Sequence, residues 1–93
     1  MSILIVGADH LGNIAKNLGY HSLIHIKGRK NINRRNLKIP EGTDLIVVMT
    51  DYVGHNLACY IRELARNQSV PVIFSKRSWA YLSQKLELNR KTA

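Results

Sequence analysis

Continuous apolar runs alternate along the chain with segments of helical periodicity. The runs are rich in Ile, Val and Leu and occupy residues 3–6, 23–26, 45–49 and 72–74. Runs of this kind are typical of strands buried on both faces, as in a parallel sheet covered by helices. Apolar residues three, four and seven positions apart predict helices over residues 11–18 and 57–65, and a third from Trp79 onward.

The order of these elements predicts an α/β fold with a small doubly wound, Rossmann- or flavodoxin-like sheet of four parallel strands. The simplest right-handed winding gives the strand order 2-1-3-4 and about three helices. The first and last helices then cover one face, and the middle helix with the crossover covers the other. We expect the long basic crossover at 27–43 to be irregular or to contain a single helical turn, and residues 89–93 to form a flexible basic tail.

Length and composition narrow the class of protein. Ninety-three residues suit a single domain, 1–93. Abundant Ile, Leu and Val argue against disorder, the single cysteine excludes a disulfide scaffold, and no apolar run is long enough to span a bilayer. The first apolar run is too short for a signal peptide, so we expect a cytoplasmic protein without a membrane partner. Its net charge of +8 favours anionic partners.

The segment after the first strand carries part of a dinucleotide-binding pattern. Gly7 and Gly12 match the first and third glycines, but Asp9 replaces the second, and its carboxylate disfavours NAD or FAD. Gly12 can instead allow close packing of the first helix on the sheet. The structural alternative is a tight turn in which Asp9 caps that helix.

The segment after the third strand is expected to lie beside it. In such a sheet the winding reverses between strands 1 and 3, and ligands bind in the crevice at their carboxyl ends. Asp51 or Thr50 can cap the next helix, and His55 near its first turn is expected to be neutral. A divalent metal could be held by two carboxylates and two imidazoles, those of Asp9, His10, Asp51 and His55.

The segment after the fourth strand adds positive charge at the same edge. Ser78 is a good cap for the last helix, where free backbone N–H groups can receive an anion. The predicted ligand-binding residues come from all three of these segments: Gly7, Asp9, His10, Gly12, Thr50, Asp51, His55, Asn56, Ser75, Lys76 and Arg77.

Residues 27–38 form a basic segment without acidic or aromatic residues. Its cations are Lys27, Arg29, Lys30, Arg34, Arg35 and Lys38. Such a cluster favours non-specific phosphate contact with nucleic acid but not base stacking. The alternative interpretation is a solubilising loop.

Four further residues suggest structural roles. His25 lies in an apolar strand and is expected to be a satisfied core or edge histidine. Cys59 has helical spacing and is expected to be a small buried hydrophobe without a basic neighbour. Trp79 and Tyr81 cannot share one helix face, so one packs inward and the other is exposed, for example at a dimer contact.

Three family resemblances bear on these motifs. Asp9, Asp51 and Ser75 resemble the acidic and hydroxyl positions of response-regulator receivers, but the paired acids after strand 1 and one strand–helix unit are missing. The four-stranded phosphotransferase IIB subunit is also similar in outline, but its cysteine after strand 1 is absent.

The third resemblance covers nearly the whole chain. Its motifs are residues 1–12, Gly28-Arg29-Lys30, Ile39-Pro40 before Thr43-Asp44, the 50–56 segment and Val70–Ser75. They look like the domain-of-unknown-function family 2325, small bacterial α/β proteins without an assigned activity. This resemblance implies an α/β fold, a bacterial origin and the importance of the two segments beside the crevice, 7–12 and 50–56. It transfers no catalytic role.

The leading functional hypothesis is a non-enzymatic binding or regulatory module that holds a small anionic ligand, nucleotide-like or phosphorylated, in the crevice between strands 1 and 3. Arg29, Lys76 and Arg77 would complete its charge. A second hypothesis is a nucleic-acid-associated protein that uses the 27–38 segment, as a homodimer pairing two basic surfaces. The third is a phosphoryl- or acyl-transfer enzyme with His55 as general base beside Asp51, although no nucleophile stands out. A divalent metal is the one cofactor that the sequence suggests.

Overall fold

The computed structural model describes residues 2–7, 11–18, 22–26, 37–51, 53–76 and 78–92, with only the backbone of 88–92. Four five- or four-residue strands form one sheet: β1 (Ser2–Val6), β2 (Ser22–Ile26), β3 (Leu45–Met49) and β4 (Val72–Ser75). All three strand pairs are parallel and the order is β2-β1-β3-β4. The predicted fold class and strand order are confirmed, and β1 lies inside the sheet rather than at its edge.

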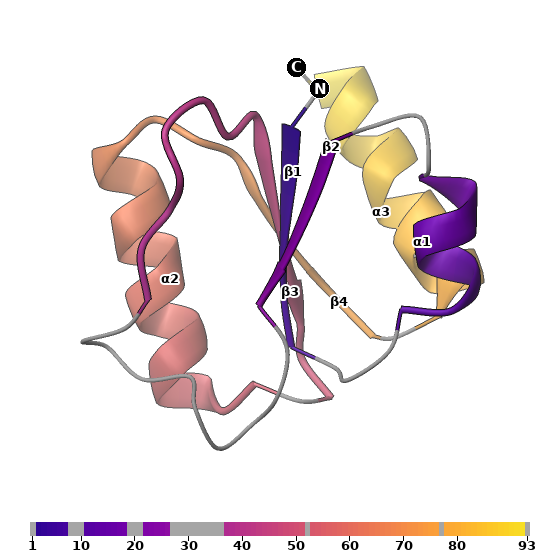
Figure 1. The fold of residues 1–93 in the computed structure, drawn as a ribbon, viewed down its shortest axis with the longest axis horizontal. Helices are drawn as coiled ribbons and strands as arrows, with labels where there is room; N and C mark the ends of the chain where they lie inside the picture. Colours follow the sequence, from indigo (N-terminus) through magenta and orange to yellow (C-terminus); the bar gives the residue numbers. More distant parts are fainter. Residues whose placement is uncertain are drawn as a thin grey trace.

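The helices cover the two faces of the sheet as the winding predicted. They are α1 (Asn13–Asn17), α2 (His55–Asn67) and α3 (Trp79–Thr92). In Figure 1, α1 and α3 lie on one side of the sheet, and α2 lies on the other together with the segment that leads into β3. Alternate residues of β1 and β3 point to opposite sides and build two hydrophobic clusters, one under each layer.

The described end of the crossover, residues 37–44, contains no helix. Leu37 and Ile39 are nevertheless buried and pack in the cluster on the α2 face. A turn follows in which the Thr43 hydroxyl donates to the Pro40 carbonyl over 2.7 Å. These residues are irregular, while 27–36 lie outside the described part of the chain, so the conformation of the crossover as a whole stays a prediction.

Two helix boundaries differ from the prediction. The stripe at 11–18 suggested a helix from Leu11, but α1 begins at Asn13, with Gly12 as its N-cap and Leu18 as its C-cap. Leu11 packs against the core although it lies before the helix. The apolar spacing therefore predicted a helix that was too long at its N-terminal end. At the other end of the chain, α3 continues to Thr92, so residues 89–92 belong to the helix rather than to a separate tail.

None of the helices in the described part of the chain has the length and apolar character needed to cross a lipid bilayer.

Candidate functional site

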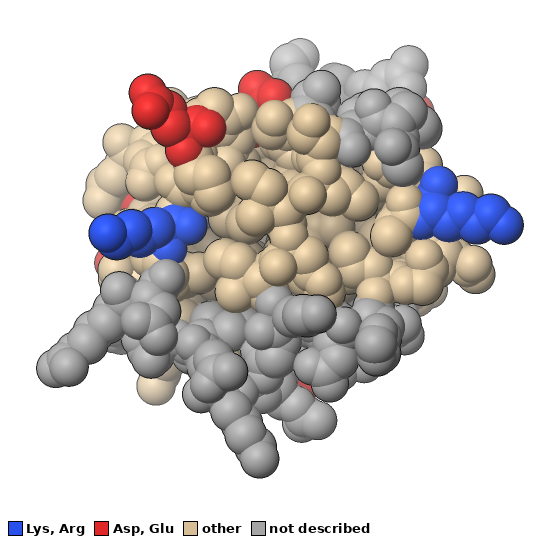
Figure 2. Space-filling view, viewed as in Figure 1, with Lys and Arg blue, Asp and Glu red and all other residues tan. Residues whose placement is uncertain are grey.

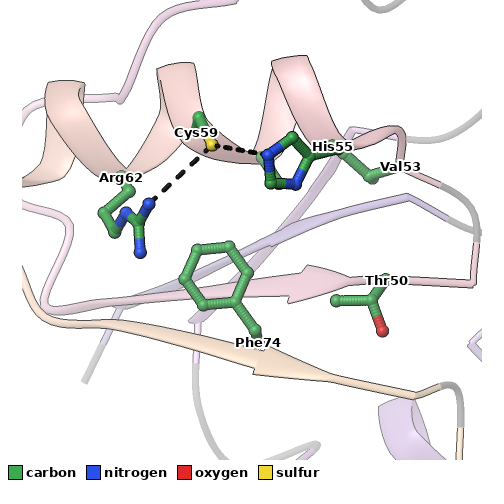
Figure 3. Close-up of a pocket in the computed structure, with 7 residues that line it drawn as sticks. Thr50, Val53, His55, Cys59, Arg62 and Phe74 are labelled. Carbon is green, nitrogen blue, oxygen red and sulfur yellow. Dashed lines mark hydrogen bonds between the residues drawn. The ribbon is translucent and has the colours of Figure 1, made fainter.

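A pocket of about 370 Å³ opens between α2 and the edge of the sheet formed by β3 and β4. We call it the α2–β4 pocket. Its lining residues come from the end of β3, the first three turns of α2 and the middle of β4: Thr50, Val53, His55, Ala58, Cys59, Arg62 and Phe74. Figure 3 shows the helix side chains above Phe74, with Thr50 and Val53 at the β3 end.

One side of α2 supplies the polar groups of the pocket. His55, Cys59 and Arg62 are four and three residues apart, a spacing that places side chains on the same helix face. The Cys59 Sγ atom lies 3.7 Å from His55 Nε2, and Arg62 Nη2 donates to this sulfur over 3.8 Å. The three side chains therefore form one continuous row along the pocket (Figure 3).

Apolar side chains form the rest of the wall. Val53 is buried, whereas Ala58 and Phe74 are half-buried. Phe74 belongs to β4, which has a neighbouring strand on one side only, and the helix layer leaves part of its ring uncovered. The pocket therefore combines an aromatic floor with a polar side that contains a cation.

The beginning of α2 favours negative charge in this pocket. The N-cap is Gly54, which makes no side-chain cap hydrogen bond, and the first turn contains no acidic residue. Backbone N–H groups at the start of a helix lack intrahelical acceptors and form the positive end of its dipole. In the described part of the chain, the contact of the Arg62 guanidinium is with the Cys59 sulfur and not with a carboxylate. Positive electrostatic potential at the polar side of the pocket follows.

The N-cap prediction for this helix was wrong. Asp51 or Thr50 was expected to be its N-cap, but the N-cap residue is Gly54. The Thr50 hydroxyl instead donates to the Ser75 carbonyl over 3.3 Å, and its N–H donates to the same oxygen over 2.8 Å. These bonds fix the rim of the pocket to β4.

Gly7 brings the ends of β1 and β3 together by direct packing. A Cβ at this position would lie 3.0 Å from Val53 Cγ2 and 3.3 Å from the Met49 carbonyl oxygen. Its N–H donates to Ile26 O over 2.9 Å, and its own carbonyl accepts from His25 Nε2 over 2.8 Å. The adjacency predicted for these two segments is present at Gly7, and the backbone of Gly7 is used within the fold.

Gly12 does not have the packing role that was expected for it. It is exposed and serves as the N-cap of α1 with a φ of 54°. A positive φ is readily adopted by glycine because it has no Cβ. Gly12 therefore allows the entry turn of α1 rather than contact between the helix and the sheet.

Ser75 and Ser78 both act within the fold. Ser75 is 1% exposed and its hydroxyl donates to the Lys76 carbonyl over 2.9 Å. Ser78 Oγ accepts from the Tyr81 N–H over 3.5 Å, as expected for the cap of α3. Lys76 is exposed with its Nζ 6.0 Å from the centroid of the Tyr81 ring. Arg77 lies outside the described residues.

The predicted metal site is only half described. Asp51 and His55 are exposed at the end of β3 and the start of α2, while Asp9 and His10 lie outside the described residues. Asn56, predicted to bind the ligand, lines a second, smaller hollow together with Cys59. Among the residues that the structure does describe, no three His, Cys, Asp or Glu side chains come together as metal ligands. The four-ligand metal site stays a prediction.

Most of the predicted nucleic-acid surface lies outside the described residues. Lys38 is the one described residue among its six cations, and its side chain is exposed. On the face seen in Figure 2, the described Lys and Arg side chains stand apart at the two sides of the molecule, with uncharged surface directly between them and acidic side chains along the upper part. Nucleic-acid binding therefore stays a prediction that depends on residues 27–36.

Two of the structural assignments are confirmed. His25, on edge strand β2, is half-buried and satisfied by its bond to Gly7. Trp79 packs against the core, and Tyr81 is the exposed aromatic residue of α3.

The assignment of Cys59 was wrong. It was expected to be a buried hydrophobe without a basic neighbour, but it is half-buried, lines the pocket and contacts His55 and Arg62. The sequence signal was the spacing of these three residues, which marks a polar row beside the apolar stripe of α2. The apolar stripe predicts only which side of α2 is buried and says nothing about this row.

Comparison with known proteins places the chain in a family. No match was found among curated proteins or among solved structures. A family model described as "Uncharacterized protein conserved in bacteria (DUF2325)" matches residues 2–88, which is nearly the whole chain and includes every residue of the α2–β4 pocket. The chain therefore belongs to this family of bacterial proteins without an assigned activity, as its sequence motifs suggested.

Proposed function

We propose that this protein is a non-enzymatic binding module for a small anionic ligand, and that the ligand occupies the α2–β4 pocket. The observation that carries the proposal is the position of the pocket: it opens at the uncapped start of α2 and is lined by both His55 and Arg62. Helix starts and guanidinium groups are the two features that proteins commonly use to bind phosphate and carboxylate groups.

The proposal differs from the sequence hypothesis in the place of the ligand. The sequence pointed to the crevice between β1 and β3, but there Gly7 packs directly against Val53 and its backbone groups bond within the fold. The pocket that Val53 also lines offers open volume, and the cation of Arg62 is part of its lining. We therefore assign the ligand to the α2–β4 pocket.

The wall composition supports a ligand with an apolar part. The volume of about 370 Å³ falls within the range of small-molecule sites, which are commonly ~300–1,000 Å³. Phe74, Ala58 and Val53 provide surface for a flat or apolar group, while Arg62 and His55 bind its charge. A nucleoside monophosphate has both parts, with the phosphate at Arg62 and the base against Phe74.

Isothermal titration calorimetry tests this proposal with AMP, inorganic phosphate and uncharged adenosine as probes. We expect AMP to bind more tightly than adenosine, and Arg62→Ala to weaken AMP binding by about tenfold or more, since a hydrogen bond to a charged group contributes roughly 1.5–3 kcal/mol.

Arg66→Ala is the matched control, because Arg66 is an exposed arginine of the same helix that does not line the pocket. It removes the same charge, so its effect on AMP binding should stay within about twofold. Equal losses in the two variants would mean that the general positive charge of the protein attracts AMP, and the proposal would be wrong. Absence of AMP binding by the native protein would also overturn it.

A further inference from the structure

We infer that the α2–β4 pocket also accepts anionic low-molecular-mass disulfides, with which Cys59 forms a reversible mixed disulfide. This inference rests on the proposed anion-binding function and adds to it a second class of anionic ligand. It would also give the protein a covalent reaction, the capture of small thiol compounds, in addition to equilibrium binding.

The position of the Cys59 sulfur is the first step of the argument. Cys59 is the only cysteine of the chain, so it has no intramolecular disulfide partner. It is half-buried and lines two hollows, the α2–β4 pocket and the smaller one beside Glu63. A thiol that only filled the core would be enclosed, whereas this one faces open volume that a ligand can enter.

The neighbours of the sulfur match the needs of thiol–disulfide exchange. The attacking species in this reaction is the thiolate, so a base must take the thiol proton. His55 Nε2 lies 3.7 Å from Sγ, within reach of that proton once its neutral tautomer presents the lone pair on Nε2. The nucleophile missing from the sequence-based catalytic hypothesis is thus present one helical turn from His55.

Arg62 and the helix start select the charge of the ligand. The guanidinium lies on the other side of the sulfur from His55, with Nη2 at 3.8 Å. Its remaining donors can bind a carboxylate in bidentate geometry, and α2 contributes the positive end of its dipole. A disulfide carrying carboxylates would therefore bind with one of its sulfur atoms near Cys59, and a cationic disulfide would be repelled.

The reaction balances without another reagent. Cys59 gives its proton to His55 and attacks one sulfur of the ligand, so that a bond from Sγ to that sulfur forms and the ligand S–S bond breaks. The departing thiolate takes the proton from His55 and leaves as a free thiol. Cys59 is oxidised to the mixed disulfide, and one sulfur of the ligand is reduced. Exchange with a second small thiol reverses the reaction.

The test compares two disulfide probes of opposite charge, oxidised glutathione and cystamine, by intact-protein mass spectrometry at neutral pH. Each rate is divided by the rate of the same probe with the protein unfolded in urea, which removes differences in intrinsic reactivity. We expect the normalised rate with oxidised glutathione to exceed that with cystamine by about tenfold, and no adduct in Cys59→Ser. Equal normalised rates would overturn the inference.

Variants of the two neighbours separate their roles. Arg62→Ala should remove the preference for oxidised glutathione, Arg62→Lys should retain part of it, and Arg66→Ala should leave it unchanged. His55→Gln should slow both probes by about tenfold or more while the preference persists. Circular dichroism of each variant verifies the fold. A preference that survives Arg62→Ala would contradict the inference.

AMP binding by Cys59→Ser distinguishes this inference from the function on which it rests. If Cys59→Ser binds AMP like the native protein and the native protein shows no probe preference, the disulfide inference fails while anion binding stands. If neither protein binds AMP and no preference is seen, both fail.

Discussion

Gly7 joins three strands of the sheet through one residue. Its N–H and carbonyl bond to Ile26 and His25 of β2, and Met49 at the end of β3 and Val53 after it leave no room for a Cβ. A φ of 103° adds a backbone conformation that side-chain-bearing residues rarely adopt. The sequence marked Gly7 as the first glycine of a nucleotide-binding pattern, whereas the structure explains it by close packing.

Gly7→Ala is therefore expected to destabilise the protein by about 2 kcal/mol or more, because the new methyl group would crowd Val53 and the φ would be strained. Urea unfolding monitored by circular dichroism measures this loss. Gly42→Ala is the matched control, since Gly42 has a φ of 85° but a Cβ there would meet no atom within 4 Å beyond its chain neighbours. We expect it to lose only about 1 kcal/mol from backbone strain. Equal losses would show that packing at Gly7 contributes nothing.

At the scale of the element, α2 begins without the side-chain cap that most helices have. Gly54 already has the extended conformation of an N-cap residue, with φ −67° and ψ 161°, and there is open space around it. The helix thus gives up a small stabilisation. The uncapped N–H groups are also the ones that the proposed anionic ligand needs, so stability and binding compete at this position.

Gly54→Asp should separate these two effects. We expect the variant to be more stable by roughly 0.5 kcal/mol, since its carboxylate can accept from first-turn N–H groups and complement the dipole. Its affinity for AMP should fall, because the same carboxylate repels the phosphate. Thermal melts and calorimetry measure the two quantities. Gly54→Asn, which caps without a charge, should lose less affinity than Gly54→Asp, and tighter AMP binding by the aspartate variant would contradict the proposed site.

The elements themselves could be predicted because their cause lies in local sequence. Residues 45–49 are apolar at every position, and all five are buried between two layers.

The polar row of α2, formed by His55, Cys59 and Arg62, could not be predicted from local sequence in the same way. Cys59 and Arg62 line a pocket only because Phe74, twelve residues after Arg62, forms its opposite wall on β4, and no local pattern encodes that arrangement. At Gly7 the space beside the backbone is occupied by Val53, and the sequence could not reveal this, since a glycine that accepts a ligand and one that accepts a valine side chain look alike in sequence.

At the scale of the whole molecule, the two faces of the sheet are closed by unlike layers. Two helices cover one face, but α2 shares the other with an irregular segment (Figure 1). Leu37 is 5% exposed and Ile39 8% exposed, so this segment is part of the core in spite of its lack of regular structure. The order β2-β1-β3 requires the chain to cross over β1 between β2 and β3. Leu37 and Ile39 hold this crossing segment against the sheet by packing in the core on the α2 face.

Ile39→Ala is accordingly expected to cost about 2–4 kcal/mol of unfolding free energy, as for a core residue within regular structure. Lys38→Ala, the adjacent exposed position, should change stability by less than about 0.5 kcal/mol. Urea denaturation with matched fluorescence and circular dichroism signals measures both. A cost below about 1 kcal/mol for Ile39→Ala would mean that the segment is only loosely attached to the α2 face.

The strand order also has a consequence for how the protein is made. β3 is the strand that connects β1 to β4, and every pairing is parallel, so no strand can pair with its neighbour through a short hairpin. During synthesis β1 and β2 can pair first. The other edge of β1, which pairs with β3 in the folded protein, has no partner until residues 45–49 leave the ribosome. Until then the nascent chain presents an open apolar edge, and chaperones that bind extended hydrophobic segments have their best target in that interval.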